Sequence, residues 1–388
     1  MIDALKKIKL VWFSCQLILS TSILLFYSFD FFAQQNVEFT EKTATASTSK
    51  NPLEFYFGKD LPVDSTSNKS SKYKVKISGV LQVHYLNEFN TNGDTIRDPD
   101  GFRILRARLI AKGKINKSIS YELMIDPRAP EQGGILRDAF LGFRIIKNLT
   151  IRVGQQKTQF GWENRQSITE LYTVNRAEMS DGLSRGENLR DIGVGILGDI
   201  KLNKNFQLED AITFTNGTRS NVAGPYDFNT KKALWGRIGI RYKKDDFFVR
   251  LGGSFGTGGI RYLYDNLLDP SDDLYVDFKR VGTDLQIDHK YFFIASEYAK
   301  GTDKVSDTVY AEPTGYQAML ALKTKWKIGP LIRYDTFEDE WKVLTCGAYY
   351  GDPKDKFRIL ANYIFRGNIK DVPRGHDDRF YLQMQIVF

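Results

Sequence analysis

The stretch FRILRARLIAKGK, residues 102–114, decides the fold that the sequence predicts. At the period of two of a β-strand, it divides into an apolar face and a basic face. The apolar face holds Leu105, Ala107, Leu109 and Ala111, and the basic face holds Arg106, Arg108, Lys112 and Lys114. A strand of a soluble sandwich usually mixes both charge signs on its polar side, so this stretch predicts one dry side and one side that meets anions.

The same alternation recurs in segments of about ten residues through the rest of the chain, which is the signature of a transmembrane β-barrel. An even number of strands closes such a barrel with both termini on one side, and we expect about sixteen. The predicted strands are 73–89, 103–114, 119–126, 137–145, 149–157, 190–200, 206–216, 232–242, 247–255, 278–288, 291–300, 314–323, 328–337, 342–351, 356–365 and 379–388.

The predicted connections alternate between short and long, and only the one at 338–341 breaks the alternation. Short periplasmic turns and long outer loops are the expected asymmetry of outer-membrane barrels. A soluble all-β protein has no reason to sort its loops in this way. The fold class that we predict is therefore all-β, an antiparallel transmembrane barrel of about 16 strands with one long infolded loop.

The two ends of the chain predict export to the outer membrane. Three lysines before an apolar run from Leu10 to Phe29 have the layout of a secretory signal, which we place at 1–33 with cleavage after Ala33. An uncleaved inner-membrane anchor is the alternative. Residues 34–72 are polar, and we predict that they form a periplasmic linker. We predict that residues 73–388 form the barrel. The last strand alternates and ends on Phe388, as bacterial outer-membrane barrels do.

The composition favours anionic partners and gives little support to catalysis. The net charge is +8 and the pI about 9.1. The basic residues alternate along strands instead of forming one patch among aromatic residues, so nucleic acid is not an expected partner. His84, His289 and His376 lack metal-ligand spacing, and we expect no metal, no cofactor and no enzyme. The glycines of 256–259 lack the Lys-Ser/Thr of a P-loop and predict a flexible outer loop.

Arginine dominates the parity that should face the lumen. Guanidinium keeps its charge and offers forked donors to oxyanions, and anion pores use such rings. Pairing of each arginine with a wall carboxylate is the structural alternative. The residues proposed for the anion path are Arg106, Arg108, Lys112, Arg144, Arg152, Lys157, Arg237 and Arg241.

The longest connection, 158–189, is too long for a simple link between strands. A fold into the barrel that narrows the pore would explain its length, although its glutamates nearly cancel its positive charge. The residues proposed for this constriction loop are Trp162, Arg165, Arg176 and Arg185, with Arg190 at its exit.

Several motifs resemble the phosphate-selective porin O and P family over roughly residues 73–388. They are FRILRARL at 102–109, KGK at 112–114, DAF at 138–140, IRVGQQK at 151–157, FGWE at 160–163 and RDIGV at 190–194. The resemblance implies a trimer of sixteen-stranded barrels in a Gram-negative outer membrane, with an arginine ladder and infolded loops that guide phosphate or polyphosphate. The matching positions for anion contacts are Arg106, Arg108, Arg152 and Lys157. Leu105 departs from the family, in which a further arginine is frequent there.

The leading functional hypothesis is passive diffusion of small anions, with phosphate or polyphosphate the first candidates, through an arginine-lined lumen of a barrel surrounded by outer-membrane lipid. A non-conducting structural or receptor barrel, which binds a partner through its loops, is the alternative from a different class. Conductance separates the two hypotheses.

Overall fold

The computed structural model describes residues 75–90, 100–128, 135–184, 190–217, 231–262, 274–304, 310–338, 341–368 and 377–388. The predicted signal and linker, residues 1–72, lie outside these ranges and stay predictions, and so does most of the connection 90–102. No helix in the described ranges has the length and hydropathy that crossing a membrane requires.

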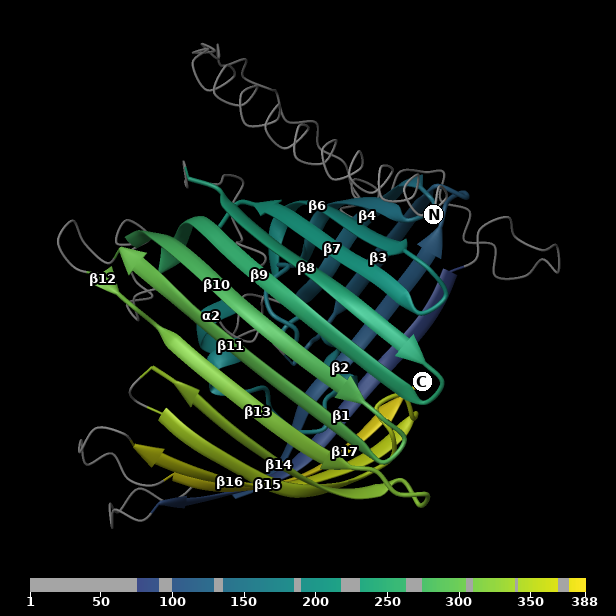
Figure 1. Ribbon diagram of the computed structural model, residues 1–388. Coiled ribbons are helices and arrows are strands. Elements are labelled where there is room, and N and C mark those ends of the chain that lie inside the picture. The colour runs from purple at the N-terminus through teal and green to yellow at the C-terminus, as the bar shows by residue number, and fades with distance from the viewer. Residues whose placement is uncertain are drawn as a thin grey trace, which may run out of the picture. The chain divides into compact units, whose positions relative to one another are not determined.

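The described strands form one closed antiparallel barrel (Figure 1). Each strand pairs with its neighbours in chain order, and β1 pairs with both β2 and β17 to close the sheet. The strands are β1 (Val75–Asn90), β2 (Asp100–Lys114), β3 (Ile119–Ile125), β4 (Leu136–Ile146), β5 (Leu149–Lys157), β6 (Arg190–Lys201), β7 (Phe206–Thr215), β8 (Ala233–Lys244), β9 (Phe247–Tyr262), β10 (Leu274–Asp288), β11 (Phe292–Lys304), β12 (Tyr310–Ala311), β13 (Thr314–Leu322), β14 (Ile328–Phe337), β15 (Trp341–Tyr350), β16 (Phe357–Asn368) and β17 (Asp377–Val387).

The closed antiparallel barrel of the predicted fold class is confirmed, and the infolded loop stays a prediction. The strand β12 has only two residues and pairs at the end of β11, whereas β11 itself continues to β13, so sixteen strands make the barrel wall. Each of the sixteen predicted strands corresponds to one of them, and β5 and β14 have the predicted bounds. The alternation of apolar and polar residues was sufficient to predict these strands, because each strand of such a barrel exposes its two faces to two different environments.

Strands such as β8 and β9 have a buried face and an exposed face. On β8, Ile238 is 56% exposed, whereas its neighbour Arg237 is 2% exposed. On β9, Leu251 and Phe255 are exposed and Ser254 between them is buried. An apolar exposed face around a closed barrel is what contact with lipid requires.

The β2 strand corrects one detail of the predicted faces. Gln82 lies opposite Arg106 and Val83 lies opposite Ile104, so Leu105 is the extra residue of a β-bulge. A bulge shifts the alternation by one residue. Leu105 therefore packs against a buried cluster that includes Leu86, and it does not lie on the apolar outer face with Leu109.

The glycines of 256–259 are not a flexible loop, as was predicted, because they lie in β9 and pair with β8 and β10. Gly256 lies so close to the ring of Trp235 that a Cβ would overlap it. Gly258 has φ +136 and approaches the backbone of Lys232 too closely for any side chain. The hairpin of β9 and β10 is therefore longer than predicted, since glycine here serves close packing between strands.

Residues 158–184 follow β5 and contain the short helices η2 (Ile168–Glu170) and α2 (Glu178–Ser184). The helix α2 lies against β11, β13 and β14 (Figure 1). Two hydrophobic clusters join this segment to the buried faces of the strands. One places Trp162 and Tyr172 against Phe293, and the other places Phe160 against Trp235.

Candidate functional site: an arginine-rich cavity

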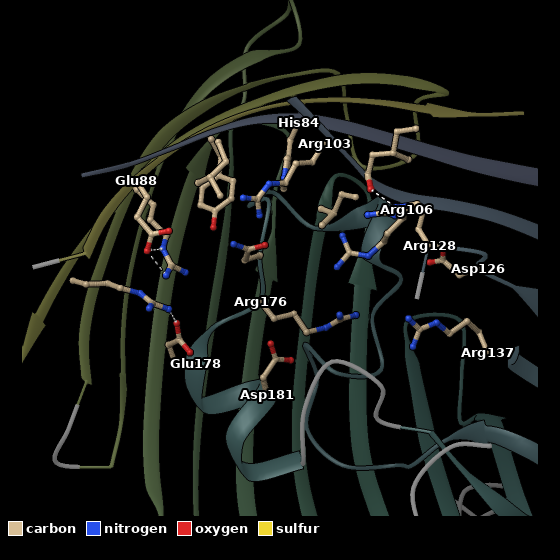
Figure 2. Close-up of a pocket in the computed structure, with 17 residues that line it drawn as sticks. His84, Glu88, Arg103, Arg106, Asp126, Arg128, Arg137, Arg176, Glu178 and Asp181 are labelled. Atoms are coloured by element: carbon tan, nitrogen blue, oxygen red, sulfur yellow. Dashed lines mark hydrogen bonds and ion pairs between the residues drawn. The ribbon is translucent and has the colours of Figure 1, made fainter. Parts of the chain in front are cut away.

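A cavity of about 530 Å³ lies between β1, β2, β17 and the residues around the start of α2 (Figure 2). Its strand residues lie in the half of the barrel nearer the long connections, because Glu88 and Arg379 are close to the strand ends there. Residues 175–181 form the opposite side. The cavity thus joins the wall that holds the opening sequence stretch to the predicted constriction loop.

Charge around the cavity is predominantly positive. Seven arginines and four carboxylates line it, so the positive charges exceed the negative ones by three. The carboxylates belong to Glu88, Asp126, Glu178 and Asp181. The arginines are Arg103, Arg106, Arg128, Arg137, Arg176, Arg366 and Arg379.

Internal ion pairs take up part of this charge. The Arg379 guanidinium donates to Glu88 at 2.5 and 2.9 Å, and Arg366 pairs with Glu178. Arg103 is exposed and makes no hydrogen bond or ion pair with any residue in the described ranges. The charge of Arg103, which has no ion pair within the described ranges, therefore adds to the positive charge on the β2 side of the cavity.

The remaining part of the lining is apolar or aromatic. Leu86 and Tyr381 are each 5% exposed, and Leu105 packs beside them. The ring of His84 lies 5.4 Å from the Tyr381 ring, centroid to centroid. Neither ring nitrogen of His84 has a hydrogen-bond partner within the described ranges, although the side chain is 4% exposed. Apolar and aromatic side chains thus lie among the arginines of the lining.

The structure divides the proposed anion path. Arg106, which donates to Gln82 at 2.9 Å, lines the cavity. Arg108 lies next to it, and its Nε donates to Asp126 at 2.9 Å. Lys157 is half-buried and donates to the backbone oxygens of Asn164 and Gln166, which belong to the following segment. Of these three cations, only Arg106 faces the cavity.

Three others on the proposed path lie along β2, β4 and β5, away from the cavity lining. Lys112 is half exposed and pairs with Glu122 at 2.9 Å. Arg152 lies over the ring of Phe140 at 4.6 Å. Arg144 is exposed near the short-turn end of β4.

Arg237 and Arg241 belong to a separate charged network on β7 to β10. Arg237 has a fully buried guanidinium, which donates to both carboxylate oxygens of Asp284 at 2.9 and 2.5 Å. Arg241 and Arg250 both pair with Glu209 at 3.0 Å. For these arginines the structural alternative stated above holds, because carboxylates of the barrel wall pair with them.

The predicted constriction residues also differ in their surroundings. Trp162 is buried against Phe293. Arg176 lines the cavity and donates to the backbone oxygens of Glu163 and Gln166. Arg190 lies in β6 and makes a buried bidentate pair with Asp138. Arg185 lies outside the described residues.

Arg165 lies close to the Arg237 network instead of the cavity. Its Nε donates to the side-chain oxygen of Gln159 at 2.8 Å. Burial and the neighbouring Arg237 lower the pKa of Arg165 to about 10, so it remains cationic at neutral pH.

Sequence reasoning missed the residues that hold the 158–184 segment. The carboxylate of Glu297 on β11 accepts from the backbone nitrogens of Trp162 and Glu163, both at 3.2 Å. Arg333 donates to the hydroxyl of Thr173 and the backbone oxygen of Asn175. Each partner is more than a hundred residues away, so no local pattern predicts the contact.

The Phe-Gly-Trp-Glu motif at 160–163 was the one available signal for this anchor. Gly161 has φ +67, and a Cβ there would collide with the Glu297 carboxylate. Glu163 accepts from the backbone nitrogen of Ala177, which joins the two ends of the segment at 2.9 Å. In the described part of the chain, no three or more His, Cys, Asp or Glu residues are grouped to hold a metal ion.

Solved structures with the same fold include porins and outer-membrane proteins. An anion-selective porin from Comamonas acidovorans has a TM-score of 0.57 and 11% identity, over 82% of this chain and 100% of its own. The trimer form of in-vitro folded OmpT from Vibrio cholerae has a TM-score of 0.53 and 13% identity, over 81% of this chain and 99% of its own. DcaP of Acinetobacter baumannii, an outer-membrane channel, has a TM-score of 0.52 and 15% identity, over 82% of this chain and 99% of its own. No curated protein matches the sequence.

The sixteen-stranded wall and its structural neighbours therefore show the fold of a porin-type β-barrel. Residues 75–225 match the family described as phosphate-selective porin O and P, which confirms the resemblance seen in the sequence.

Proposed function

We propose that the protein is an outer-membrane porin that lets small anions diffuse passively through its barrel, along the arginine-rich cavity. The observation that carries this proposal is the excess of three positive charges around the cavity. Charges of one sign along a narrow path concentrate ions of the opposite sign and raise their rate of entry. The family description makes phosphate the first anion to test, and the Comamonas porin of similar fold is described as anion-selective.

In this proposal, residues 158–184 narrow the lumen and direct ions to the cavity side. Hydrophobic contacts of Trp162 and Tyr172 with β11 and β15 support it, because water and ions avoid a packed apolar core. The buried cations around them, such as Arg358, donate to backbone oxygens of the segment and serve its placement. Arg103, Arg106 and Arg176 are then the residues proposed to contact a passing anion.

Bilayer conductance under a salt gradient tests the proposal. We expect a reversal potential of the sign given by anion preference. Cation-selective currents would contradict it, and negligible conductance would favour the alternative barrel that binds partners through its loops. Phosphate at millimolar concentration that leaves the chloride current unchanged would argue against phosphate as the preferred anion.

The homotrimer implied by the family resemblance stays a prediction. The trimer form of OmpT, which shares the fold, supports it. Mass measurement of the detergent-solubilised protein tests it, and a monomeric mass would contradict it.

A further inference from the structure

Three lysines lie on the outer face of the barrel, near the ends of the strands that lead into the long connections. Lys279 is on β10, Lys300 on the neighbouring β11 and Lys342 on β15, and all three are exposed (Figure 1). Residues next to them, such as Ala299 and Val343, are buried, so the alternation of the strands directs the lysines away from the lumen. We call these three residues the lysine belt.

Exposed tyrosines lie one step closer to the middle of the barrel wall than the belt. Tyr298 comes two residues before Lys300 on the same face of β11, and it pairs with Tyr316 on β13. Tyr334 on β14 is also exposed, and its partner on β15 is two residues from Lys342. Tyrosine is enriched at the boundary between hydrocarbon and headgroups. The belt therefore lies at the depth of the lipid headgroups on the long-loop side.

Lys279 and Lys300 are close enough to contact the same group. Val281 lies opposite Lys300 and two residues from Lys279, so the two lysines are diagonal neighbours on antiparallel strands. Diagonal neighbours are about 7–8 Å apart, and flexible lysine side chains cover that distance. Lys342 lies three strand spacings from Lys300, which is about 14 Å. The belt thus offers one paired position and one single position.

The belt makes no ion pair of its own. Within the described ranges, no side-chain hydrogen bond or ion pair joins any of the three lysines to another residue. Asp277, on the same face of β10, pairs with Lys231 at 2.6 Å. Glu312 and Glu338 are exposed, but they lie further toward the loops than the lysines. The nearest anions at the depth of the belt are therefore those of the surrounding lipid.

The surface around the belt fits a molecule with an anionic head and apolar chains. Val281 and Phe255 are exposed beside the lysines on the side toward the middle of the wall, and they lie opposite each other on β10 and β9. The exposed Thr257 and Thr314 lie opposite two of the lysines, where their hydroxyls can also donate to a headgroup. A free inorganic anion would use only the polar part of this surface, whereas a lipid uses both parts.

We propose that the lysine belt binds the phosphate groups of anionic lipids in the leaflet at the long-loop end. Lys279 and Lys300 share the phosphate of one lipid, and Lys342 contacts the phosphate of a neighbouring lipid. The acyl chains lie along Val281 and the exposed tyrosines, where contact buries apolar surface. This site is on the outer face, so it is independent of the anion path proposed for the lumen.

Native mass spectrometry of the full chain in detergent tests the site. The probes are phosphatidic acid, which is anionic, and phosphatidylcholine with the same acyl chains, which has no net charge. Attraction of one lysine to an anionic lipid surface corresponds to a factor of about 5 in affinity. With two lysines on one phosphate, we expect phosphatidic acid to bind about 25-fold more tightly than phosphatidylcholine.

Matched triple variants assign the preference to the belt. Glutamine at all three belt positions should bring the ratio of the two affinities close to one, whereas arginine at the same positions should keep it. A control removes three other exposed lysines at the short-turn end and should also keep the ratio. The circular dichroism of each variant reports that the β-barrel is folded. The control substitutions are Lys201→Gln, Lys244→Gln and Lys356→Gln.

Equal affinity of the wild-type chain for the two lipids overturns the inference. An unchanged ratio in the glutamine variant of the belt also overturns it, and so does an equal loss of the ratio in the short-turn control. Inorganic phosphate that displaces phosphatidic acid at an equal concentration would show a site for free anions instead of a lipid site. Anion selectivity is measured separately by the reversal potential, so the lipid site and the anion channel fail by different results.

Discussion

Replacing Arg103 with glutamine, and separately Arg237 with glutamine, distinguishes arginines that meet ions from arginines that hold the wall. Arg237 lies on the lumen parity of β8, and the bulge at Leu105 brings Arg103 to the same face of β2 as Arg106. Arg103 lines the cavity without an ion pair in the described ranges, whereas Arg237 is fully buried and bidentate to Asp284. We expect Arg103→Gln to reduce anion selectivity with little change in stability. We expect Arg237→Gln to reduce stability with little change in anion selectivity.

The magnitudes follow from the two environments. An anion about 4 Å from an exposed guanidinium gains about 1 kcal/mol in water, which is a factor of about 5 in local occupancy. Arg103→Gln also lowers the cavity excess from three charges to two. Loss of the Arg237 cation leaves the Asp284 carboxylate buried and uncompensated, and breaking a buried pair in this way costs about 3–5 kcal/mol.

Reversal potentials in a salt gradient measure selectivity, and the urea midpoint of the barrel in detergent or lipid vesicles measures stability. Lys327→Gln, in an exposed pair near the short-turn end, serves as the control for both. A loss of selectivity in Arg237→Gln equal to that in Arg103→Gln would refute the division of the arginines, because it would place Arg237 on the ion path.

Three further predictions concern the segment 158–184 and its surroundings. Gly161→Ala should displace the segment from Glu297 and raise single-channel conductance, whereas Gly253→Ala, which has open space around its Cβ, should not change it. Glu297→Ala should leave two buried backbone donors without an acceptor, at about 1–3 kcal/mol each, and lower the urea midpoint more than Glu297→Gln; equal midpoints would contradict the anchor. Arg190→Gln should destabilise the barrel by about 3–5 kcal/mol through its buried Asp138 partner, and an unchanged midpoint would show that this pair contributes nothing.

The strands were predictable because alternation is a local property. A residue two positions away shares a face, so ten residues are enough to show which face is apolar. The Gly256 and Gly258 positions were misread for the same reason. Glycine in isolation indicates a loop, and only the neighbouring strands show that close approach to Trp235 and Lys232 requires it.

The cationic side chains were predictable as a set, although their partners were not. Arg106 and Arg237 read alike in the sequence, since each alternates with apolar residues in a strand. Asp284, the partner of Arg237, lies 47 residues further along the chain and reaches it across β9. The bulge at Leu105 was equally hidden, because the register of β2 depends on its pairing with β1.

The sequence by itself determined the barrel, its strand number and the positive character of the buried face, since these depend on the period of two and on composition. The tertiary structure alone decided which arginines line a cavity and which are paired inside the wall. Ion pairs form between strands and with the 158–184 segment, so their partners are set by closure of the sheet. The same closure brings Leu105 and His84 to the side of the cavity opposite Arg176.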